Sequence, residues 1–117
     1  MKAKGATLVE RGAVEVGLSD YEAVEVGPFE QLLVLRIVGK IGLDYAWSPI
    51  VVTHLAEEFQ TSRQKLRRGI EVISKEGLLE FEVKGNAESR GRRVNRARPS
   101  RWLIDRVHEV IGEEENE

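Results

Sequence analysis

Apolar and acidic residues alternate near the N-terminus in two copies of one short pattern. Residues 13–17 read A-V-E-V-G, and residues 23–27 repeat the same letters ten positions later. Strict alternation is the period of a strand with one buried face, and residues 18–21 between the copies suit a turn. The pattern therefore predicts a β-hairpin within residues 1–27, with its glutamates directed outward.

From Pro28 onward the apolar positions follow helical spacing. Proline is favourable at the first helical position, so we expect a helix over residues 28–38. Its apolar side chains point in nearly every direction, and such a helix has to be covered on more than one side. A second helix is expected over residues 49–59, with Ser48 as its N-cap and Pro49 at its first position.

A third helix is expected after a tight break at residues 60–62. Thr61 and Gln64 match the capping-box pattern at its start, and Gly77 is a suitable C-terminal stop. Its two faces differ in character, one apolar and one mainly basic. They are formed by Leu66, Ile70 and Ile73, and by Arg63, Gln64, Arg67, Arg68 and Lys75, respectively.

The period then changes to that of strands. Residues 79–84 alternate apolar and charged side chains, residues 85–91 form a polar tip with a glycine at each end, and residues 92–98 return as a second strand. Ser100 is expected to cap a final helix, and residues 113–117 form an acidic tail.

Composition is consistent with one folded domain over residues 28–112, preceded by the hairpin as an appendage. The chain has 117 residues, of which 41% are hydrophobic and 32% charged. It contains no cysteine, which excludes disulfides and cysteine-ligated metals. No apolar run approaches the roughly 20 residues of a membrane span, and the N-terminus lacks an apolar signal segment. A cytoplasmic location is therefore expected.

Charge is strongly segregated along the chain, although the formal net charge is only −2. Residues 60–101 carry twelve Lys and Arg against five Asp and Glu, whereas residues 1–59 and 102–117 are both acidic. Six arginines fall within residues 88–101 alone. A local field of this kind decides which ligand docks, and it favours a polyanion.

The order of the expected elements resembles the winged helix-turn-helix family of DNA-binding regulators, over residues 29–111. The resemblance is carried by L-A-E-E-F at residues 55–59, T-S-R at 61–63 and I-S-K-E-G-L-L at 73–79. It is closest to small regulators of the archaeal, viral or multiple-antibiotic-resistance-regulator-like kinds. The implied fold is α+β, with a three-helix core, a two-stranded wing and a C-terminal helix. The implied function is sequence-specific binding of double-stranded DNA at the nucleoid, for transcriptional regulation, without a cofactor.

In such a complex the third helix enters the major groove and the wing follows the backbone or the minor groove. Arginine suits both tasks because its guanidinium binds phosphates and guanine edges through two hydrogen bonds. The expected DNA contacts of the helix are Ser62, Arg63, Gln64, Lys65, Arg67, Arg68 and Lys75, and those of the wing are Arg90, Arg92, Arg93, Arg96 and Arg98. Regular alternation would place Arg92, Arg96 and Arg98 on the side of Val94, which makes Arg90 and Arg93 the clearer solvent-facing candidates.

Two other functions remain open at this point. The G-K-I-G sequence at residues 39–42 resembles the backbone-clamping loop of a KH domain, which would bind RNA, but it equally suits a helix C-cap. A winged helix can also serve protein–protein assembly, although its third helix would then be expected to lack this many basic residues. Catalysis is not expected, because His54 and His108 are isolated histidines and no metal-ligand spacing occurs.

A homodimer is expected from the excess of apolar helix surface. So short a chain offers few elements to cover both the first and the last of these helices. The expected dimer surface consists of Val34, Leu35 and Val38 on the first, and of Trp102, Leu103, Val107, Val110 and Ile111 on the last. The alternative is that the N-terminal segment covers the first helix within one chain.

Overall fold

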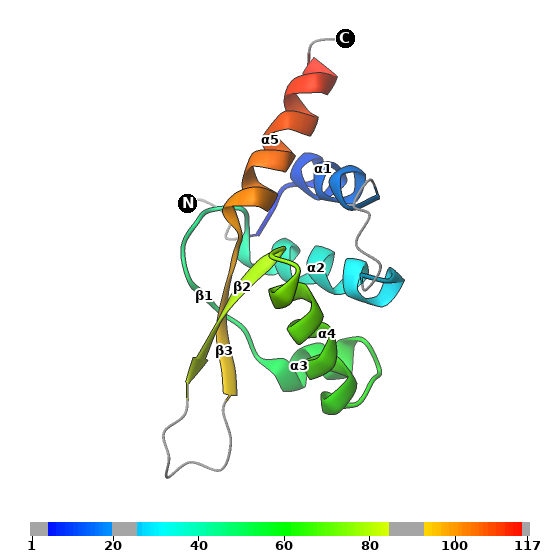
Figure 1. The fold of residues 1–117 in the computed structure, drawn as a ribbon, viewed down its shortest axis with the longest axis vertical. Helices are drawn as coiled ribbons and strands as arrows, with labels where there is room; N and C mark the ends of the chain where they lie inside the picture. The colour runs from blue at the N-terminus through cyan, green and yellow to red at the C-terminus, as the bar shows by residue number, and fades with distance from the viewer. Residues whose placement is uncertain (1–4, 20–25, 85–92, 116–117) are drawn as a thin grey trace.

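The fold combines helices and a small sheet in an α+β arrangement (Figure 1). The computed structural model describes residues 5–19, 26–84 and 93–115, and within these ranges it has five helices and three strands. In chain order they are α1 (Leu8–Ser19), α2 (Pro28–Ile41), β1 (Ser48–Pro49), α3 (Val52–Glu58), α4 (Arg63–Lys75), β2 (Leu79–Lys84), β3 (Arg93–Pro99) and α5 (Arg101–Glu115).

Residues 8–19 form helix α1, so the predicted N-terminal β-hairpin is wrong for this segment. A reciprocal capping box fixes the start of the helix: the N–H of Glu10 donates to Thr7 Oγ1 at 3.1 Å, and the N–H of Thr7 donates to Glu10 Oε1 at 2.9 Å. The buried positions of α1 recur with helical spacing and are Ala13, Val14, Gly17 and Leu18. Most of the second A-V-E-V-G copy lies outside the described residues.

Helix α2 is the centre of the core. Its Leu33, Val34 and Ile37 are fully buried, because α1 packs on it from one side and α4 from another. Helix α1 also packs along α5. Gly17 allows that approach, since a Cβ atom at this position would lie 3.0 Å from Cγ of Arg106. One chain therefore buries most of the apolar side chains of α2 and α5.

Ser48 and Pro49 do not start a helix, contrary to the prediction from their sequence. They form the short strand β1, which pairs with Ala97 and Arg96 of β3. The residue before a proline favours extended backbone, and a proline without an N–H group is tolerated in an edge strand. Helix α3 consequently begins three residues later than expected, at Val52.

Helix α4 follows α3 after a short turn in which Gln60 has a positive φ of 51°. Its N-cap is Ser62, whose Oγ accepts from the N–H of Lys65 at 3.1 Å, so the predicted start at Thr61 is one residue early. The predicted stop is confirmed, because Gly77 adopts a φ of 76° just beyond the helix. The predicted cap of the last helix is also confirmed: the N–H of Leu103 donates to Ser100 Oγ.

The strands form one antiparallel sheet in the order β1-β3-β2. Leu79 and Phe81 of β2 lie opposite Pro99 and Ala97 of β3, and the register shifts by one residue between Glu82 and Val83. β1 joins the sheet to the segment that enters α3, while β2 starts directly after α4. The sheet is thereby tied to both helices of the helix–turn–helix unit, α3 and α4 (Figure 1).

Candidate nucleic-acid interface

Helix α4 presents most of the predicted DNA-binding side chains on its exposed side. Leu66, Gly69, Ile70 and Ile73 are buried, and Gly69 permits close packing because a Cβ there would lie 3.2 Å from Leu33 Cδ2 of α2. The opposite side is exposed to solvent. All the predicted contacts of the helix and its cap are exposed there, together with Glu71 and Ser74; these contacts are Ser62, Arg63, Gln64, Lys65, Arg67, Arg68 and Lys75.

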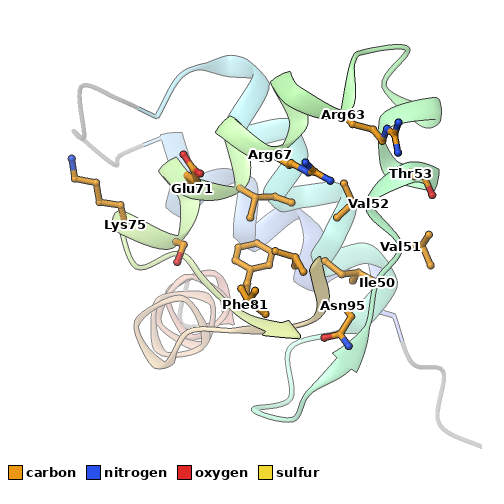
Figure 2. Close-up of a pocket in the computed structure, with 14 residues that line it drawn as sticks. Ile50, Val51, Val52, Thr53, Arg63, Arg67, Glu71, Lys75, Phe81 and Asn95 are labelled. Atoms are coloured by element: carbon orange, nitrogen blue, oxygen red, sulfur yellow. The ribbon is translucent and has the colours of Figure 1, made fainter. Parts of the chain in front are cut away.

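The exposed side of α4 has two separate edges. Arg63 and Arg67, one helical turn apart, lie along the edge that faces the sheet (Figure 2). Lys65 lies on the other edge, where its Nζ is 5.0 Å from the ring centroid of Phe29 in α2. Lys65 is thus separated from Arg63 and Arg67, whereas the sequence prediction grouped all three.

A cleft of about 890 Å³ separates α4 from the sheet. One wall is formed by α4, a second by β2 and β3, and a third by residues 50–53, which lead into α3 (Figure 2). Phe81 and Asn95 line the sheet side, while Arg63 and Arg67 line the helix side. No feature of the sequence pattern indicated this cleft, because it depends on how the sheet is tilted against the helix.

A β-bulge changes the direction of the arginines in β3. Val94 pairs with Val83, but Arg96 pairs with Glu82, so Asn95 is the extra residue between them. The expectation from regular alternation is therefore wrong: Arg96 and Arg98 lie on the face of the sheet opposite to Val94. Val94 lines the cleft, and the two arginines consequently face away from it.

Arg98 makes a compact set of contacts on that outer face. Its guanidinium lies 2.8 Å from the carboxylate of Glu80 and over the rings of Tyr45 and Trp47, at 3.9 and 4.2 Å from their centroids. The hydroxyl of Tyr45 also donates to Glu80, at 3.1 Å. Arg98 is therefore engaged within the chain, in contrast to its predicted role as a DNA contact.

The other predicted wing contacts are Arg90, Arg92, Arg93 and Arg96. Arg96 is half exposed, and its Nε lies 4.0 Å from Glu82. Arg90 and Arg92 lie outside the described residues, as does the side chain of Arg93. Of the five predicted wing contacts, Arg96 is thus the one that the described part of the chain leaves accessible.

The glycine pair at residues 39–42 does not form a loop between two helices. Gly39 is still within α2, and Gly42 is its C-cap with a φ of 83°. The Nζ of Lys40, between them, lies 2.6 Å from Glu58 of α3. This geometry fits the helix-end interpretation and offers no backbone clamp of the KH type.

The two tryptophans are not core residues. Trp47 is 36% exposed and Trp102 43% exposed. Most of the predicted dimer surface, in contrast, is buried within one chain, including Val34, Val38 and Val107. A homodimer stays a prediction, but it would need another surface, because α1 already covers these side chains.

Among the described residues, no group of acidic or histidine side chains is arranged to hold a metal ion, and no helix there has the length and apolarity needed to cross a membrane. His54 and His108 are both exposed. The chain matches no protein-family model, and no curated protein or solved structure is significantly similar to it. The candidate site therefore has to be interpreted from its own chemistry.

Proposed function

We propose that this protein has a winged helix-turn-helix fold and binds double-stranded DNA as a transcriptional regulator, with α4 in the major groove. The observation that carries this proposal is the division of α4 into two sides. One side is buried on α2 through Leu66, Ile70 and Ile73, and the other exposes four arginine and lysine residues in addition to Lys65. A helix fixed in this way can insert its basic side into a groove without losing contacts to the core.

The position of the sheet supports the same proposal. Strands β2 and β3 project from the core beside α4, toward the end of the molecule at which α3 and the start of α4 lie (Figure 1). Strand β1 anchors them to the segment before α3. A duplex that receives α4 would therefore meet the β2–β3 hairpin along its backbone.

The charge distribution determines which part of the surface would bind. Residues 60–101 carry the basic excess, while the acidic segments 1–59 and 102–117 supply α1, α2, α3 and α5. α1 and α5 lie away from the turn between α3 and α4 (Figure 1). A polyanion would thus be attracted to the α4 side and repelled from the opposite end.

Selection of bound sequences from a random duplex pool tests the proposal. We expect enrichment of a short motif, since a base-reading arginine contributes about 1–3 kcal/mol of discrimination against a wrong base. A parallel gel shift compares duplex DNA, duplex RNA and single strands at low salt. Preference for RNA, or absence of binding to all of them, would contradict the proposal and favour an RNA-binding or protein-assembly role, respectively.

A further inference from the structure

The cleft between α4 and the sheet has the dimensions of a small-molecule site. Its volume of about 890 Å³ falls within the range of roughly 300–1,000 Å³ that is usual for ligand pockets. It also leaves apolar side chains in contact with solvent. Val51 and Val83, on two different walls, are each 48% exposed, and burying them would be favourable.

The chemistry of the walls changes from one end of the cleft to the other. Ile70, Phe81 and Val83 belong to the apolar part, which suits a flat apolar group. Arg63 and Arg67 lie together beside Thr53 at one end, whereas Glu71 and Lys75 lie toward the other (Figure 2). The end with two guanidinium groups is the place where an anionic group would be bound.

The bulge in β3 adds a polar atom to the same cleft. Oδ1 of Asn95 is buried and has no hydrogen-bond partner in the described part of the chain, although Asn95 lines the cleft. Buried polar atoms are normally hydrogen-bonded, and an exception often marks a functional position. A ligand hydroxyl or N–H group would satisfy this oxygen after a rotation of the amide.

We propose that the cleft binds a small amphipathic anion, with its apolar body against Phe81 and Val83 and its anionic group on Arg63 and Arg67. Duplex DNA does not supply this chemistry, because a groove presents phosphates, sugars and base edges rather than an extended apolar body. The cleft and the exposed side of α4 nevertheless share both arginines. A ligand in the cleft would therefore compete with DNA for them, a consequence that rests on the proposed function.

The probe for this site is 8-anilinonaphthalene-1-sulfonate, a flat apolar anion whose fluorescence rises on burial. We expect saturable binding to the full-length wild-type protein. The double variant Arg63→Gln/Arg67→Gln should bind at least about tenfold more weakly, since about 1.4 kcal/mol of lost ion pairing corresponds to that factor. Arg11→Gln/Arg68→Gln removes the same charge from residues that do not line the cleft and should bind as the wild type does.

Two further comparisons separate charge from apolar contact. N-phenyl-1-naphthylamine, the same ring system without the sulfonate, should bind more weakly than the sulfonate and respond little to the arginine substitutions. Ser74→Phe, which places a ring in the cleft from an exposed position of α4, should remove binding of both probes while circular dichroism and thermal unfolding stay unchanged. Equal binding by both double variants, or undiminished binding by Ser74→Phe, would overturn the site.

Competition with DNA is a separate measurement. In an anisotropy titration with a labelled duplex, saturating sulfonate probe should raise the dissociation constant of the wild-type protein for DNA, but not that of Ser74→Phe. Unchanged DNA binding would refute the competition, but it would not contradict the binding of the probe in the cleft. If the protein binds no DNA at all, the proposed function fails, while the probe titrations still decide whether the cleft is a site.

Discussion

Arg98 and Glu80 lie directly opposite each other in the β2–β3 pair, and their side chains meet at 2.8 Å. The Arg98 guanidinium also covers the rings of Tyr45 and Trp47. Residues 43–47 have no regular secondary structure, so these contacts hold that segment against the outer face of the sheet. Arg98 therefore has a structural role, although its sequence context resembles that of the other arginines predicted to bind DNA.

Replacement of Arg98 by alanine should reduce stability rather than DNA affinity. We expect a loss of about 1–2 kcal/mol in the free energy of unfolding, because an ion pair and two cation–π contacts disappear together. Urea denaturation measures this change. Arg98→Lys, which keeps the charge but not the planar stacking, should recover part of the loss. An Arg98→Ala variant with wild-type stability and weakened DNA binding would show that this arginine contacts DNA instead.

The packing of α1 can be tested by a matched pair of truncations. Leu18 is 2% exposed, whereas Val16, two residues earlier, is 43% exposed. Leu18→Ala should therefore cost about 2–5 kcal/mol, and Val16→Ala should change the free energy of unfolding by less than about 0.5 kcal/mol. Denaturant titration of both variants is sufficient. Similar costs for the two would indicate the alternating burial of a strand rather than a helix.

The sequence indicated the type and order of most elements from Pro28 onward because long apolar stripes and glycine stops are local signals. The N-terminal error has an equally local cause. Five alternating residues fit a strand, but the longer spacing of Ala13, Val14, Gly17 and Leu18 is helical. The decisive signal was the Thr7–Glu10 pair, a capping box visible in the sequence.

The direction of the wing arginines could not be predicted, since it depends on one inserted residue. A bulge at Asn95 moves Arg96 and Arg98 to the other face of the sheet, and nothing in R-V-N-R-A-R marks its position. The contacts of Glu80 with Tyr45 and Arg98 join segments 35 and 18 residues apart in the chain, respectively. Contacts of this kind are set by tertiary packing, and no periodic pattern in the sequence indicates them.

Glu58 of α3 forms a pH-dependent ion pair with Lys40 of α2. The hydrogen bond from Lys40 Nζ to its carboxylate, with added attraction from Lys40 and Arg36, lowers the pKa of Glu58 below its ordinary value of 4.5. A lowered carboxyl pKa stabilises the folded state above the unfolded pKa, and this stabilisation is lost as pH falls through the folded value. The stabilisation by this ion pair is therefore fully present at neutral pH and absent in strong acid.

Glu58→Gln should accordingly lower the free energy of unfolding by less than about 1 kcal/mol near pH 7, because both side chains of the pair are partly exposed to solvent. The difference from wild type should vanish as pH falls well below 4.5. Urea denaturation across this pH range measures it. Glu57→Gln, which removes the adjacent carboxylate of α3, serves as the control and should have the wild-type free energy of unfolding near pH 7. A difference that grew in acid would contradict the assignment.

The proposed binding of duplex DNA by the exposed side of α4 is tested by fluorescence anisotropy with a labelled duplex. Arg63→Gln, Arg67→Gln and Arg68→Gln are compared with Arg11→Gln, an equal charge change on the exposed surface of α1. A variant that loses a base contact should bind the selected site about 1–3 kcal/mol more weakly, and one that loses a phosphate contact should reduce the salt slope by about 1. Arg11→Gln should bind as the wild type does. If all four variants bind the duplex with the wild-type affinity and salt dependence, α4 is not the DNA-binding element.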